Sequence, residues 1–262
     1  MRAWSEEKEL WREAFSDLGR FLTLRADFEL FDRFSLRHLA IGALFTWLVG
    51  IARNWDLPSA TPTQAWGLQS LAYIIFMAFG IWVLLLPLKA GRGYLHVLTM
   101  VSLTSVPGLI YGVPVEMFLP MEDARNTNVA FLVVVATWRV AMAVHYLKRA
   151  CDLSGGGAMS VLGLPVSMIV IGLIQSGRAG AVLEMMGGLR TVGAEADAYV
   201  DQVIFFLGLI AYPFAFGCVI GYALLLSGGG DGPPIQWRGR RPRIPDVDER
   251  SSPPVDLDKG PE

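Results

Sequence analysis

Long apolar stretches alternate with short polar ones along most of this chain. Six stretches are apolar enough, and close enough to the roughly 20 residues needed to cross the hydrocarbon of a bilayer, to be membrane spans. They cover residues 36–52, 67–88, 94–119, 129–147, 158–175 and 203–226. The pattern predicts an all-α polytopic membrane protein in which residues 36–226 form a bundle of six transmembrane helices.

The first 35 residues follow a different pattern, with aromatic and apolar positions at helical spacing. Trp4, Trp11, Phe15, Leu18 and Leu22 share one helical face, and acidic residues dominate the opposite face. This predicts an amphipathic cytoplasmic helix. It either packs on the cytoplasmic ends of the spans, lies in the membrane interface, or binds a partner. Interfacial helices usually carry a basic polar face, so packing on the spans is slightly favoured over the interface.

The last segment, residues 227–262, is rich in glycine, proline and charge. Such a composition cannot bury enough apolar surface to offset the entropy of ordering, so it predicts a disordered cytoplasmic tail. The domain organisation expected is therefore a helical region over 1–35, a membrane domain over 36–226 and this tail.

Positive charge is distributed unevenly between the two sides of the predicted bundle. Of the 22 Lys and Arg residues, 17 lie in the N-terminal region, the loops 89–93 and 148–157, and the tail, whereas four lie in the alternate connections. By the positive-inside rule both termini are cytoplasmic. Arginine outnumbers lysine 18 to 4, which is typical of a GC-rich bacterial gene. We therefore expect a multi-pass protein of the bacterial inner (cytoplasmic) membrane.

Composition narrows the function classes. Hydrophobic residues make up 53% of the chain and charged residues 18%, well below the quarter usual in soluble domains. No basic stripe with interleaved aromatics predicts nucleic-acid binding, and the two cysteines have no metal-ligand spacing. No enzyme motif is present. We expect no catalytic residue, metal or cofactor. His38, His96 and His145 fall near the cytoplasmic ends of spans, as anchoring residues commonly do; a tridentate metal site is the weaker alternative.

Arg139 is the residue that apolar composition does not explain. A charge at the bilayer centre costs at least about 2.5–3.5 kcal/mol, so it normally faces the bundle interior or a watery cavity. At about 1.5 Å per residue, Arg139 and the hydroxyls of Thr104 and Ser105 reach similar depths from opposite sides. We predict that these hydroxyls, Tyr111 and carbonyls freed by Pro107 surround the guanidinium.

Glu116 completes this predicted intramembrane polar cluster only if the third span is re-entrant or strongly kinked. The cluster has two alternative interpretations. Arg139 either coordinates an anion or gates a pathway, or it joins the third span to the fourth as a structural element.

Two further patterns are weaker. The segments LIYGVP and LIAYP, in the third and sixth spans, predict equivalent broken helices if the chain is an inverted repeat. Gly217 and Gly221 form a Gly-x-x-x-Gly helix-packing face.

The run AGRGYLHVLTMVSLTSVPGLIYGVP, residues 90–114, resembles the central part of bacterial Yip1-like membrane proteins, and the resemblance extends to about residue 147. The acidic DLYGP-type motif of eukaryotic members is absent, and six spans are predicted here where the family usually has five. The resemblance implies a non-enzymatic membrane protein that organises membranes or serves as a complex subunit. Expected partners are the lipid bilayer and another membrane protein or a second copy. The alternative is a small transporter or channel in which Arg139 lines an anion or solute pathway.

Overall fold

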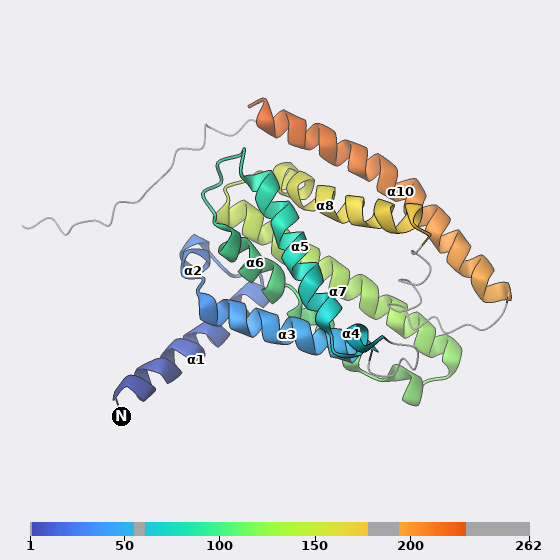
Figure 1. Cartoon of the computed structure of the whole chain (residues 1–262), viewed down its shortest axis with the longest axis horizontal. Coiled ribbons are helices and arrows are strands. Elements are labelled where there is room, and N and C mark those ends of the chain that lie inside the picture. The colour runs from blue at the N-terminus through green and yellow to red at the C-terminus, as the bar shows by residue number, and fades with distance from the viewer. Residues whose placement is uncertain (1, 55–60, 178–193, 229–262) are drawn as a thin grey trace, which may run out of the picture. The chain divides into compact units, whose positions relative to one another are not determined.

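The computed structural model describes residues 2–54, 61–177 and 194–228. The α-helices are α1 (Arg2–Leu22), α2 (Phe28–Asp32), α3 (Leu36–Asn54), α4 (Pro62–Ala65), α5 (Leu68–Leu85), α6 (Tyr94–Leu103), α7 (Met121–Ala150), α8 (Gly155–Gln175) and α10 (Ala194–Leu226), and the 3-10 helices are η1 (Val106–Gly112) and η2 (Val115–Met117) (Figure 1). Residues 229–262, most of the predicted disordered tail, lie outside the described residues.

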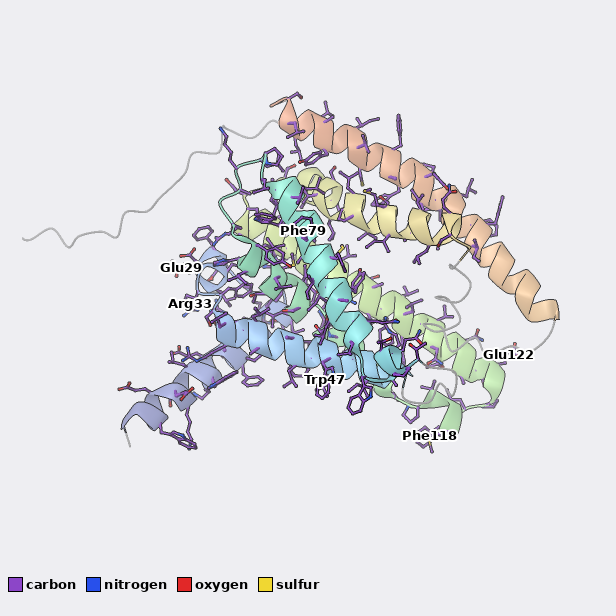
Figure 2. All side chains as sticks on the ribbon, in the orientation of Figure 1. Glu29, Arg33, Trp47, Phe79, Phe118 and Glu122 are labelled. Carbon is purple, nitrogen blue, oxygen red and sulfur yellow. The ribbon has the colours of Figure 1, made fainter. Side chains whose placement is uncertain are left out.

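Six segments of the described residues are long and apolar enough to cross a membrane, which confirms the predicted spans. Large apolar side chains project outward from them, including Phe76, Phe79 and Ile210 at 73%, 53% and 66% exposed, and Figure 2 labels Phe79. Exposure of so much apolar side chain is expected when the surrounding solvent is lipid. The chain is therefore a multi-pass membrane protein.

The fourth span starts well before the predicted residue 129. Glu122 and Asp123 lie in the first turn of α7, where negative charge interacts favourably with the helix dipole. A hydropathy pattern does not detect this polar first turn. The first span likewise extends past its predicted end, because α3 continues to Asn54 and so carries Arg53 on the helix.

The third span is broken, as its prolines predict. α6 ends at Leu103, and Pro107 stands at the start of η1, where its missing amide hydrogen costs nothing. The fifth and sixth spans differ, because α8 and α10 run through Pro165 and Pro213 without interruption. The sixth span is therefore not the broken counterpart that the inverted-repeat hypothesis requires.

The helices α8 and α10 pack closely because glycines remove side chains between them. A Cβ placed on Gly221 would collide with the side chain of Ser160, and one on Gly163 would meet Cys218 and Phe214. A Cβ placed on Gly217 would meet no atom of another described helix within 4 Å. Of the predicted Gly-x-x-x-Gly pair, only Gly221 makes a close helix contact.

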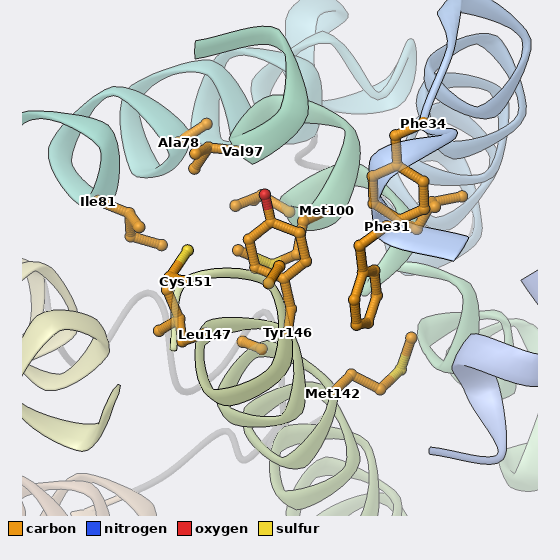
Figure 3. Packing of buried hydrophobic residues seen from close by; sticks show 14 of the residues in the cluster. Phe31, Phe34, Ala78, Ile81, Val97, Met100, Met142, Tyr146, Leu147 and Cys151 are labelled. Atoms are coloured by element: carbon orange, nitrogen blue, oxygen red, sulfur yellow. The ribbon is translucent and has the colours of Figure 1, made fainter. Parts of the chain in front are cut away.

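The N-terminal region packs against the spans through an aromatic core. Phe31 contacts Phe21 and Phe34 edge to face, each at 5.5 Å between ring centroids, and lies 5.0 Å from Tyr146 of α7. Figure 3 shows Phe31 and Phe34 beside Tyr146 in this cluster. Such aromatic pairs stabilise by about 0.5–1.5 kcal/mol each beyond the area they bury.

Two hydrogen bonds to α7 fix the chain between α1 and α2. The indole nitrogen of Trp138 donates to the carbonyl of Leu22 at 2.9 Å, and Nε2 of His145 lies 2.7 Å from the carbonyl oxygen of Ala26. Among the three sequence-based alternatives, the structure shows α1 packing on the spans.

The face of α1 that packs is rotated from the predicted one. The buried residues are Ala14, Leu18 and Phe21, whereas Trp4 and Phe15 are 67% and 51% exposed. The buried positions lie in the C-terminal half of α1, where Phe15 nevertheless stays exposed. There the rotation buries Phe21 in the aromatic core.

Candidate functional site

The predicted intramembrane cluster begins where the third span breaks. Thr104 and Ser105 are buried there, at 4% and 3% exposed. The hydroxyl of Thr104 donates to the carbonyl of Val101 at 2.7 Å, one turn back along the same segment. This hydroxyl therefore satisfies the backbone of its own broken helix.

Tyr111 lies against Arg53 rather than within hydrogen-bond distance of Arg139. The Cζ atom of Arg53 is 5.3 Å from the centroid of the Tyr111 ring. The glycines of η1 permit this contact, since a Cβ on Gly112 would lie only 3.2 Å from the Cβ of Ala52 on α3. η1 thus rests directly on the C-terminal half of α3, and the ring of Tyr111 supports the guanidinium.

Arg139 reaches the same neighbourhood from α7, which also packs against η1. Its positive charge acts on both Arg53 and Tyr111. Among the described residues no hydrogen bond joins Arg139 to Thr104, Ser105 or Tyr111. The predicted hydrogen bonds from the Arg139 guanidinium to these hydroxyls are therefore not found among the described residues. Whether the cluster has a function stays a prediction.

Glu116 lies in η2, beyond the end of the broken third span. Its backbone is described and its side chain is not, so its predicted pairing with Arg139 stays a prediction. The structure thus brings Tyr111 and Arg53 together, places Arg139 on a helix that packs against η1, and keeps the Thr104 hydroxyl on its own backbone. It also adds Arg53, which the sequence interpretation assigned to a loop.

The two guanidinium groups differ in how far the structure compensates them. Arg53 gains a cation–π contact, which contributes about 0.5–2 kcal/mol, and lies in the last turn of α3, where a cation is favoured by about 0.3–1 kcal/mol. Arg139 is far from either end of α7 and has neither contribution. Placing the Arg139 charge within the membrane costs at least about 2.5–3.5 kcal/mol, and neither contribution offsets this cost as it does for Arg53.

A second polar centre surrounds Arg92, in the connection before α6. Its Nη1 donates to Asp32 at 2.9 Å, its Nε donates to the carbonyl of Ala150 at 3.0 Å, and its Cζ lies 4.7 Å from the ring centroid of Phe28. The side chain is 8% exposed. Arg92 thus joins α2 to the end of α7, and its contacts are structural.

Two polar atoms near this centre are buried without a hydrogen-bond partner among the described residues, namely Nη2 of Arg92 and the hydroxyl of Tyr146. Tyr146 has 0% of its surface exposed and its ring fills the aromatic core. Figure 3 shows Cys151 in the same buried cluster. Burial raises the pKa of the Cys151 thiol to about 12, which leaves it protonated and unreactive near neutral pH.

A third polar centre fastens α1 to α3. Asp17 is 7% exposed, and its carboxylate oxygens lie 3.4 Å from both Arg33 and Nε2 of His38. Nδ1 of His38 accepts from the backbone amide of Ser35 at 3.2 Å, which orients the ring. A buried carboxylate requires such partners, so this contact determines which face of α1 is buried.

The three histidines have separate partners. His38 contacts Asp17 and His145 contacts the carbonyl of Ala26, as given above, and His96 lines a groove of about 450 Å³ between the N-terminal ends of α3 and α6. The described residues contain no group of three potential metal ligands among His, Cys, Asp and Glu. The tridentate histidine hypothesis therefore has no geometric support there. The groove is lined by Phe34, Ser35, Leu36, Leu39, Gly93, Tyr94, Leu95, His96 and Thr99.

Sequence reasoning missed Arg53, Arg92 and Asp17. Arg53 and Arg92 lie at the ends of spans, where an arginine is an ordinary membrane anchor. Asp17 is one of several acidic residues on α1. Only Arg53 had a signal in the sequence. If the polar residues at the end of the first span are included in the helix, the span extends to Asn54 and contains Arg53.

Comparison with protein-family models, with curated proteins and with solved structures found no match. The resemblance to Yip1-like proteins therefore stays a prediction.

Proposed function

We propose that this chain is a non-catalytic membrane protein that serves as a complex subunit or organises the membrane, with α1 as its contact surface for a partner. The single observation that carries the proposal is that one face of α1 is buried against the rest of the chain while the aromatic side chains of Trp4 and Phe15 on the same helix are exposed. Figure 1 shows the N-terminal half of α1 extending away from the other helices.

The exposed part of α1 has the chemistry of a protein-binding surface. Trp4 and Phe15 are 11 residues apart, so they lie on one helical face, and both are exposed. Aromatic residues of this kind dominate binding energy at protein interfaces. The Nζ atom of Lys8 lies 4.0 Å from the centroid of the Trp4 ring, which orients that ring on the surface.

Charge favours a protein partner over the lipid surface. The exposed positions of this part of α1 include Glu6, Glu7, Glu9 and Glu13 against Lys8 and Arg12. An acidic helix is repelled by anionic lipid headgroups, which attract basic segments. The partner we propose therefore presents a basic surface with an apolar pocket.

The placement in the membrane belongs to this proposal. The excess of Lys and Arg on one side of the spans supports two cytoplasmic termini, and the arginine-rich composition supports a bacterial inner membrane. Absence of catalytic activity and membership of the Yip1-like family are parts of the same proposal. The structural roles of Asp17 and Arg92 support it, because these buried charges hold helices together.

Site-specific photocrosslinking in native membranes tests the role of α1. A photoreactive phenylalanine analogue replaces Trp4 or Phe15, and the matched control replaces Phe76, which is 73% exposed on a membrane span. We expect discrete protein adducts from α1 and lipid adducts from position 76. The adduct should disappear when the α1 charges Glu6, Glu7 and Glu9 are reversed to Lys.

Lipid adducts at positions 4 and 15, or adduct yields that charge reversal leaves unchanged, would contradict the proposal. An adduct of twice the chain mass identifies a second copy as the partner, and a heterologous adduct identifies another protein.

A second candidate function is a small transporter or channel with Arg139 lining an anion or solute pathway. The observation that favours it is the pair of arginines beside the broken third span. Reconstitution in vesicles tests it, with phosphate or chloride efflux as the measurement. Efflux that Arg139→Gln abolishes and Arg149→Gln leaves intact supports transport. No efflux above protein-free vesicles contradicts it.

A further inference from the structure

Arg53 and Arg139 bring two guanidinium groups from different spans to the same 3-10 helix. Arg53 lies over the ring of Tyr111, and the charge of Arg139 acts on Arg53 and on Tyr111. Both carrier helices, α3 and α7, pack against η1. The close approach of Gly108 to Val49 and of Gly112 to Ala52 holds η1 against α3. The ring of Tyr111 is therefore held beside Arg53 by packed backbone.

Neither cation has a negative partner within the described structure. The ion pairs of the described residues use Arg12, Arg20, Arg33, His38 and Arg92 as cations, and neither Arg53 nor Arg139. No hydrogen bond of either guanidinium is found among those residues. Arg92, in contrast, is a buried arginine with protein partners, since it contacts a carboxylate, a carbonyl and a ring. Two like charges in a low-dielectric region repel each other, and an anion between them converts that repulsion into attraction.

We propose that Arg53, Arg139 and the hydroxyl of Tyr111 form a binding site for an oxoanion of the phosphate type. A guanidinium binds two oxygens of one anion through parallel N–H donors, so two guanidinium groups are best matched by an anion with three or four oxygens. A carboxylate offers only two. The phosphoryl oxygens come either from free phosphate or from a lipid headgroup, because Arg53 lies in the last turn of its span.

This site does not depend on a partner for α1 and requires no movement of the ion across the membrane. It is therefore tested by binding, whereas the proposed function is tested by crosslinking through α1. If the binding experiment fails, the crosslinking result can still be interpreted, and the reverse also holds.

The experiment measures anion binding to the purified full-length protein in detergent. In the first arm, inorganic phosphate is titrated into delipidated protein, and the affinity is read from the rise in thermal unfolding temperature. In the second arm, native mass spectrometry counts phosphatidylglycerol molecules retained by protein extracted from membranes. We expect saturable binding in the first arm for a free anion, or stoichiometric retained lipid in the second for a headgroup.

The variants are Arg53→Gln, Arg139→Gln and the double variant. Each single substitution should weaken binding about tenfold or more, and the double variant should lose little beyond the singles, because both residues bind one ligand. Arg149→Gln is the matched control, since it removes the same charge from an exposed position on the same helix. Arg139→Lys keeps the charge and loses the guanidinium fork, so it serves if the glutamine variant does not fold.

Binding that is absent from both arms, or that Arg149→Gln weakens as much as Arg139→Gln, overturns the proposal. The variant Glu116→Gln tests whether the carboxylate of Glu116 already serves as the counterion of the two arginines. If phosphate binding appears only in Glu116→Gln, then Glu116 already neutralises the arginines and the proposal fails. If the wild type binds phosphate and Glu116→Gln binds equally well, the arginines act on the external anion as proposed.

Discussion

Arg92, Asp17 and Asp27 show how single polar residues hold the N-terminal region in place. Arg92 joins Asp32 to the end of α7, Asp17 joins α1 to His38, and Asp27 accepts the amide of Leu30 at 2.9 Å to cap α2. Asp27 also accepts from Arg20 of α1 at 3.1 Å, so each of these residues connects two segments that apolar packing alone would leave free to rotate or slide. Directional contacts of this kind fix one arrangement among several of similar buried area.

Replacing Arg92 with methionine should lower the free energy of unfolding by about 1.5–3 kcal/mol. The change keeps an apolar stem of similar length but removes the charged hydrogen bonds to Asp32 and to the carbonyl of Ala150. Thermal unfolding in detergent measures the effect. Arg149→Met on the exposed end of α7 is the control, and equal destabilisation of the two variants would contradict a structural role for Arg92.

Asp27 gives a prediction about pH. The amide of Leu30, and then Arg20, hold the pKa of the Asp27 carboxyl below its usual value. A depressed pKa means that the stabilisation is present above the ordinary carboxyl pKa of about 4 and is lost as pH falls through the lower folded pKa. Because the side chain is more than half exposed, we expect at most about 1 kcal/mol.

The measurement compares thermal unfolding of the wild type and Asp27→Ala between pH 6 and pH 3. The difference between the two proteins should shrink as the pH falls. A difference that stays constant over this range would show that the cap does not depend on the carboxylate charge.

At the scale of elements, small residues decide how closely helices approach. Gly221 and Gly163 allow α10 to lie against α8, and the hydroxyl of Tyr222 on α10 donates to the carbonyl of Leu84 on α5 at 2.8 Å. Within a bilayer, where lipid and side chains are equally apolar, such close packing is the main attraction between helices. α10 is otherwise largely exposed, so this seam is its principal connection to α8 and α5.

Gly221→Leu should separate α10 from α8, because the new side chain occupies the position of Ser160. Overpacking of this kind costs about 1–3 kcal/mol. A disulfide formed between cysteines introduced at Ser160 and Tyr222 should consequently form more slowly in that variant. Gly217→Leu is the matched control on the same helix, since nothing within 4 Å opposes it. Slowing of equal size in both variants would show that the seam does not depend on Gly221.

Some elements could be predicted from the sequence because their signal is local. A run of about 20 apolar residues is enough to predict a span, and Pro107 is enough to predict the break in the third span. The neighbours of Arg139 were less accessible. Counting residues matched its depth to Thr104 and Ser105, but depth does not say which way a side chain points around the helix axis. The end of α3 at Asn54, which makes Arg53 a neighbour of Tyr111, depends on contacts between segments distant in sequence.

At the scale of the described fold from α1 to α10, the N-terminal region and the ends of the spans share one core. Phe31 contacts Phe21, Phe34 and His145 as well as Tyr146, so the same ring belongs to the packing of α1, α2 and α7. Residues sharing a core are expected to unfold together.

Phe31→Ala should therefore destabilise both the N-terminal region and the spans, by about 3–5 kcal/mol. Two probes measure this, protease cleavage near the exposed Leu24 and loss of near-ultraviolet circular dichroism on heating. Both transitions should shift together. Phe76→Ala, on a lipid-facing side chain, should shift neither. Cleavage at Leu24 well below the temperature of the second transition would show that the N-terminal region opens independently.

The contact between His145 and Ala26 has a consequence for the order in which the protein is made. Its two residues are separated by 119 positions. At a synthesis rate of about 5–20 residues per second, the ribosome adds the second partner roughly 6–24 s after the first. Phe21, Phe31 and Phe34 are therefore synthesised well before the part of α7 that packs on them. The N-terminal region can therefore complete its aromatic core only after the fourth span has been synthesised.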